Sequence, residues 1–112
     1  MFFISRTASI SIITFLLAAC GTAQVGRDFD VHLVEMKIER GITTQSQVHA
    51  WFGAPTSTGI NVDTGGERFD EWTYYFASGK LPGMSNAKVK MLQVKFDKQG
   101  TVRGYNWSAS DQ

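Results

Sequence analysis

The chain has 112 residues, with 11 basic against 10 acidic ones; this length suits one domain and excludes two separate cores. Because the charges nearly balance, there is no basic surplus to bind phosphates, and we expect no nucleic acid among its partners. Cys20 is the only cysteine, so a disulfide within the chain is excluded.

Residues 1–19 have the order of a secretory signal. A positive start with Arg6 is followed by a mostly apolar run over residues 10–17 and then by two alanines. The run is too short to span a bilayer, which takes about 20 apolar residues. Leu17-Ala18-Ala19-Cys20 resembles the lipobox of bacterial lipoproteins, which are cleaved just before the cysteine and acylated on its thiol. We therefore predict a lipoprotein signal peptide over residues 1–19 and lipidation of Cys20; the alternatives are an ordinary signal with a chance cysteine and a buried N-terminal helix.

The lipobox resemblance also implies a location. It implies three acyl chains on Cys20, and a residue other than aspartate after the cysteine, here Gly21, implies the outer membrane. The domain would then face the periplasm. No polybasic cluster follows Cys20, so we expect membrane attachment to rest on the acyl chains, which anchor stably when there are two or more. Residues 20–29 begin with a small, polar stretch and are predicted to be a lipidated tether.

A first helix is predicted from Val31 to Arg40. Asp28 or Asp30 can cap its start, and Gly41 suits the stop position after its end. The apolar residues at helical spacing are Val31, Val34 and Ile38, with Leu33 and Met36 beside them.

A second helix is predicted to follow at once. Thr44 and Gln47 have the spacing of a capping box, and Gly53 with Pro55 ends the helix. The i, i+3, i+4 spacing of Val48, Trp51 and Phe52 places these three side chains on one face.

The rest of the chain predicts antiparallel strands. The strands are expected over residues 56–62, 69–76, 88–97 and 101–107. The connections are expected to be a turn over 63–66, a long loop over 77–87 and a hairpin loop over 97–100. Val89 is out of phase with the apolar residues that follow it, which predicts a bulge.

Helices gathered ahead of strands are typical of an α+β fold rather than of a parallel sheet. We expect two N-terminal helices packed on one face of a three- or four-stranded antiparallel sheet. The alternation along residues 69–76 places Trp72 and Tyr74 beneath the helices and Tyr75 on the opposite face. The predicted domain covers residues 30–108, and residues 109–112 are a tail.

Four segments together resemble the SmpA/OmlA/BamE family of small outer-membrane lipoproteins, from about Val34 to Val102. They are Gly41-Ile42-Thr43, Phe52-Gly53-Ala54-Pro55, Trp72-Thr73-Tyr74-Tyr75-Phe76, and the run from Leu92 to Asp97 with Gly100 and Val102 after it. The resemblance implies a non-catalytic support role in assembling β-barrel proteins of the outer membrane or in keeping the envelope intact. Its partners would be the outer-membrane assembly machinery or other envelope proteins. The alternative is a stand-alone periplasmic binding or inhibitor lipoprotein on the same fold.

The sequence offers no catalytic or metal-binding pattern. His32 and His49 are the only histidines, and no group of ligand residues has the spacing of a metal site, so we expect no enzyme, metal or cofactor. Asp63-Thr64-Gly65 resembles the motif of aspartic proteases, but the charged residues after it favour a plain turn. The charged run over residues 67–71 is interpreted as a solvated strand edge, with a partner-binding rim as the alternative.

Partner binding is therefore expected on a surface. Because two helices can cover only one face of the sheet, we expect the other face to expose Tyr75, Tyr105 and Trp107 as aromatic anchors. Leu81 and Met84, near the tip of the predicted long loop, complete the predicted binding residues. The alternative is that Tyr75 and Trp107 only cover the sheet.

Overall fold

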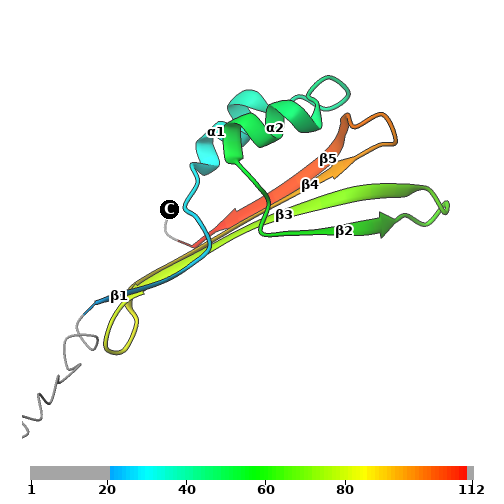
Figure 1. Ribbon diagram of the computed structural model, residues 1–112. Helices are drawn as coiled ribbons and strands as arrows, with labels where there is room; N and C mark the ends of the chain where they lie inside the picture. The colour runs from blue at the N-terminus through cyan, green and yellow to red at the C-terminus, as the bar shows by residue number, and fades with distance from the viewer. Residues whose placement is uncertain (1–20, 111–112) are drawn as a thin grey trace, which may run out of the picture.

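The computed structural model describes residues 21–110, so the predicted signal peptide and Cys20 lie outside the described residues. Within this range the chain forms an α+β domain of two helices and one antiparallel sheet of five strands. In chain order these are β1 (Thr22–Val25), α1 (Val31–Lys37), α2 (Gln45–Phe52), β2 (Ser57–Val62), β3 (Arg68–Lys80), β4 (Ser85–Phe96) and β5 (Val102–Ala109). Both helices lie over one face of the sheet (Figure 1). The α+β class is confirmed, but the helices follow a strand instead of opening the domain, and five strands replace the predicted three or four.

The sheet is organised around β3, its longest strand. β4 pairs with one edge of β3, and β5 pairs with β4. The other edge of β3 is shared, because β2 pairs with Arg68–Thr73 and β1 pairs with Ala77–Lys80. Residues 22–25, predicted as part of a tether, are therefore a strand. The reason is tertiary: β3 extends beyond β2 and leaves backbone groups that need partners, which β1 supplies.

The chain leaves the sheet after β1 and returns to it before β2, in both cases close to Tyr75. The Tyr75 N–H donates to Thr56 Oγ1 at 3.0 Å, so a side chain fills the gap between the two edge strands. Gly26 lies against the Tyr75 carbonyl, where a β-carbon would collide with the oxygen. Only glycine fits this close approach, and it also has a φ of 78°.

The predicted long loop over residues 77–87 is wrong. β3 and β4 continue through most of it and leave only the turn Leu81–Met84, which contains a cis Leu81–Pro82 bond. Gly79, read as a loop former, lies in β3 under Met84, where a β-carbon would be 2.7 Å from Met84 Cε. The bulge predicted at Val89 is also absent from this pairing, since Ala77 opposes Val89 in regular register.

The C-terminal end is more ordered than the predicted tail. β5 runs to Ala109, and the Ser110 N–H then donates to the Val89 carbonyl at 2.9 Å. The Ser110 hydroxyl oxygen accepts from the Val89 N–H at the same distance. The part of the predicted tail that the structure describes is thus bonded to β4.

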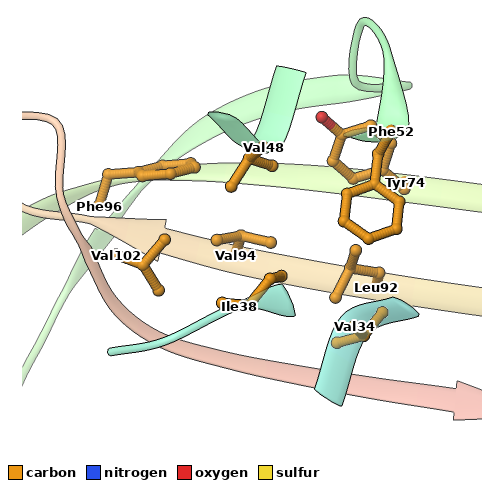
Figure 2. Packing of buried hydrophobic residues seen from close by; sticks show 9 residues of the cluster. All are labelled: Val34, Ile38, Val48, Phe52, Tyr74, Leu92, Val94, Phe96 and Val102. Carbon is orange, nitrogen blue, oxygen red and sulfur yellow. The ribbon is translucent and has the colours of Figure 1, made fainter. Parts of the chain in front are cut away.

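The core lies between the helices and the sheet (Figure 2). Its cluster consists of Val34, Ile38, Val48, Phe52, Tyr74, Leu92, Val94, Phe96 and Val102. Two residues of the predicted first stripe, Val34 and Ile38, belong to this cluster, and the third, Val31, is buried outside it. Two of the three residues predicted for α2 also belong to it, while Trp51 is half-buried. Trp72 is also half-buried, with its ring centroid 4.9 Å from that of Phe96. The predicted helix-facing side of the sheet is confirmed.

The N-termini of both helices have the caps that the sequence predicts. Asp30 Oδ1 accepts from the His32 N–H at 2.9 Å, and Thr44 with Gln47 forms the reciprocal capping box. The first helix ends at Lys37, three residues before the predicted end, because the chain must then turn toward β5.

The turn between the helices is bonded to the start of β5. The Gly41 N–H donates to the Val102 carbonyl, and the Val102 N–H donates to the Thr43 carbonyl, both at 2.8 Å. Thr43 is the only polar residue among residues 21–110 that is classed as buried, and its Oγ1 accepts from the Glu39 N–H at 2.8 Å. These bonds hold the helix layer in one position on the sheet.

A second tie joins the end of α2 to the middle of β3. The Tyr74 hydroxyl donates to the Gly53 carbonyl at 2.9 Å and so satisfies a carbonyl at the end of a helix. Burial of the ring raises the pKa of Tyr74 to about 12 from 10.0, because the site disfavours the phenolate.

Thr43→Val tests the first tie. The change keeps the shape of the side chain and removes the acceptor of the Glu39 N–H, so we expect the free energy of unfolding to fall by about 1–3 kcal/mol. The measurement is urea denaturation of residues 21–112. Thr58→Val, at an exposed position of β2, is the control and should change stability by less than about 0.5 kcal/mol. Equal losses for the two variants would contradict this role of Thr43.

Tyr74→Phe tests the second tie through pH. The folded pKa lies above that of the unfolded chain, so the stabilisation is complete below pH 10 and is lost as pH rises to about 12. We expect Tyr74→Phe to lower stability by about 0.5–1.5 kcal/mol at pH 7 and to reduce the fall in stability between pH 10 and 12. Tyr75→Phe, which alters an exposed ring, is the control. An unchanged alkaline slope in Tyr74→Phe would refute the assignment.

Candidate functional site

The five predicted binding residues lie in three separate places. Tyr75 lies on the sheet face away from the helices, named here the open face. Tyr105 and Trp107 lie on the helix-covered side, and Leu81 and Met84 belong to the β3–β4 turn. The prediction that Tyr105 and Trp107 share the open face with Tyr75 is therefore wrong.

The register of β5 explains where Tyr105 and Trp107 lie. They oppose Val94 and Leu92, and directly opposed residues share a face, so both rings point to the helix side and pack against the core. The pairing shifts by one residue at Arg103, between Val102 and Gly104. Without this bulge, regular alternation from Val102 would put Tyr105 and Trp107 on the open face, where they were predicted to lie.

Trp107 has a specific partner on α1. Its indole N–H donates to Glu35 Oε1 at 3.3 Å. Trp107 and Tyr105 line a shallow hollow beside Glu35 and Arg40. Trp107 therefore covers the sheet, as the alternative to a binding role expected, but it does so on the helix side and not on the open face.

The open face carries a polar row across four strands. Asn61 Nδ2 of β2 donates to one carboxylate oxygen of Glu71 at 3.0 Å, and Gln93 Nε2 of β4 donates to the other at 3.4 Å. Asn106 of β5 opposes Gln93 and continues the row. These residues line a depression of about 260 Å³ together with Lys95. The row offers donors and acceptors to a polar partner.

Sequence reasoning missed this row. Glu71 was interpreted as part of a solvated strand edge, yet it lies in the strand that pairs on both sides and its carboxylate is bonded twice. The alternation signal did place Glu71 on the face away from the helices. Its amide partners come from strands whose register the sequence does not determine.

The same face becomes apolar toward β1. Tyr75 opposes Met91, and Ala77 opposes Val89, so these four side chains adjoin one another on the open face. Tyr75 is 37% exposed and Val89 39% exposed. An aromatic ring beside aliphatic side chains suits contact with the apolar surface of another protein.

Beyond the helices, the β1 end of the sheet has a hollow on the helix side. It measures about 560 Å³, and Thr22, Phe76, Lys80 and Lys88 are among its lining residues. At its side, Lys90 Nζ donates to Asp28 Oδ1 at 2.8 Å and to the Phe29 carbonyl at 3.0 Å. The bond from Lys90 lowers the pKa of Asp28 below its usual value.

The other candidates for chemistry have structural roles. Asp63 Oδ1 accepts from the Gly65 and Glu67 N–H groups, both at 2.9 Å, so the Asp-Thr-Gly motif forms the predicted turn. The His49 ring lies edge-on to Trp72. Among residues 21–110, no group of His, Cys, Asp or Glu side chains is placed to hold a metal ion. No helix within the same range is both long and apolar enough to cross a membrane.

No family model matches the chain, and neither a curated protein nor a solved structure matches it. A functional assignment therefore depends on the residues and on their geometry.

Proposed function

We propose that this chain is an outer-membrane lipoprotein, attached through acyl chains on Cys20 and facing the periplasm. Its role is a non-catalytic one, in which it supports the assembly of β-barrel outer-membrane proteins or the integrity of the envelope. It acts by binding other envelope proteins.

One observation carries the proposal: the residues that resemble the SmpA/OmlA/BamE family contact one another across the helix–sheet interface. Gly41 and Thr43 bond to Val102, and Gly53 bonds to Tyr74. Segments that lie up to about sixty residues apart in the sequence thus contact one another where the helices pack on the sheet. A resemblance distributed in this way supports similarity of the whole domain more strongly than four short matches would separately.

The open face supports a binding role. It combines the Asn61–Glu71–Gln93 row with the apolar patch around Tyr75, and the described helices leave it uncovered (Figure 1). Polar groups fixed by neighbours and a partly exposed aromatic ring are the usual elements of a protein interface.

Cys20→Ser tests the anchor. We expect radiolabelled palmitate to enter the parent chain and not the variant, and the variant to leave the membrane fraction. Gly21 offers a matched pair of controls, because a β-carbon there would have no atom within 4 Å. Gly21→Ala should keep the chain in the outer membrane, whereas Gly21→Asp should shift it to the inner membrane. Palmitate incorporation into Cys20→Ser equal to that of the parent would rule out the anchor.

Photo-crosslinking in cells tests the binding face. A photoreactive amino acid at position 75 should crosslink to an envelope protein, whereas one at Met36, which is 75% exposed on α1, should not. Crosslinks from position 75 to the barrel-assembly machinery support the proposed role. Crosslinks to a single unrelated periplasmic protein favour the alternative of a stand-alone binding or inhibitor lipoprotein. Crosslinks from position 36 alone would place the working surface on the helices and contradict the open face.

A further inference from the structure

The start of the described chain is bonded to the β3–β4 turn. The Leu81 N–H donates to the Gly21 carbonyl at 2.8 Å, and β1 then pairs with Ala77–Lys80. Cys20 is covalently joined to Gly21, so their α-carbons are about 3.8 Å apart. Acyl chains on Cys20 would therefore begin beside this turn. We name β1 and the turn Leu81–Met84 together the anchor end (Figure 1).

β1 takes up the residues that directly follow Gly21 in the predicted tether, so little of it is left as a linker next to Cys20. Only Gly21 separates Cys20 from the first strand residue, Thr22. A flexible linker of about ten residues would let the domain tumble roughly 15–20 Å from the lipid. With lipid on Cys20, a single residue followed by four paired ones would hold the end of the sheet close to the lipid surface instead.

The turn has the composition of a segment that contacts lipid. Leu81-Pro82-Gly83-Met84 contains no charged residue, and Met84 is 44% exposed. Leucine and methionine side chains at the boundary between headgroups and acyl chains bury apolar area that water would otherwise hydrate.

Charge along the sheet points the same way. Residues 77–91 contain Lys80, Lys88 and Lys90 and no acidic residue. Asp28, beside them, is bonded to Lys90. The turns at the opposite end of the sheet carry three acidic residues, Asp63, Glu67 and Asp97, against one lysine, Lys98. Although no basic cluster follows Cys20 in sequence, the fold brings lysines to the anchor end, where they favour anionic headgroups.

We propose that the anchor end rests in the headgroup layer of the membrane, with Leu81 and Met84 at the acyl boundary and Lys80 among anionic headgroups. This inference rests on the proposed lipidation of Cys20. Lysine stems can lie along apolar surface while their ammonium groups reach the phosphates, which suits Lys80 directly before the turn. The helices and the polar row of the open face then project away from the bilayer.

The test uses the full mature lipoprotein in vesicles of phosphatidylethanolamine and phosphatidylglycerol. Because acylation blocks the Cys20 thiol, Met84→Cys supplies the one thiol for an environment-sensitive fluorophore. Lys98→Cys, exposed in the β4–β5 turn, is the matched control. We expect a blue shift and quenching by spin-labelled lipid at position 84, and neither effect at position 98. Adding Lys80→Gln should weaken the quenching at position 84.

Equal emission and quenching at positions 84 and 98 would overturn the inference. Palmitate labelling of the same preparation separates the two proposals. An acylated chain whose label at position 84 stays in water overturns this inference alone. A chain without lipid on Cys20 overturns the proposed function and this inference with it.

Discussion

The structure depends on the exchange of backbone hydrogen bonds between the α1–α2 turn and Val102. Neither helix is long enough to be stable by itself, since isolated helices of fewer than about 12 residues are marginal in water. α1 has 7 residues and α2 has 8. Their stability must come from the apolar face that they bury, and the bonds of Gly41 and Thr43 to Val102 determine which face meets the sheet. The hydroxyl of Thr43 completes the turn without leaving a buried polar atom unpaired.

Local signals predicted the helices well. The capping box, the Gly53 stop of α2 and the apolar spacing are interactions within about eight residues, so the sequence alone contains them. Gly41 does not end α1, whose C-cap is Ile38. The helix-facing residues of β3 and β4 followed from strict alternation for the same reason. The α+β class could be inferred because these elements come in an order that a parallel sheet does not allow.

Most of the errors involve pairing between strands, which a short window of sequence does not determine. β1 has no strong strand pattern, and it is a strand because β3 extends beyond β2 and needs an edge partner. Gly79 and Asn86 read as loop residues, yet the pairing of β3 with β4 carries them into strands. One bulge at Arg103 moved Tyr105 and Trp107 to the other face, since a shift of one residue reverses every side chain that follows. The polar row was missed because its bonds join three strands.

β3 connects the two surfaces that the proposals use. Lys80 lies at the anchor end of this strand and Glu71 in the polar row, nine positions away along continuous paired backbone. At about 3.3 Å per residue, this separation is about 30 Å. In the proposed orientation, the length of β3 would fix the distance between the bilayer and a partner bound to the polar row. The reason is that only Gly21 separates Cys20 from the first strand of the sheet. The side chains nearer the membrane on the same face, Tyr75 and Val89, would then contact the part of the partner that lies closest to the bilayer. In this proposed orientation, the short connection to Cys20 would restrict which envelope proteins reach the open face, independently of the side chains that line it.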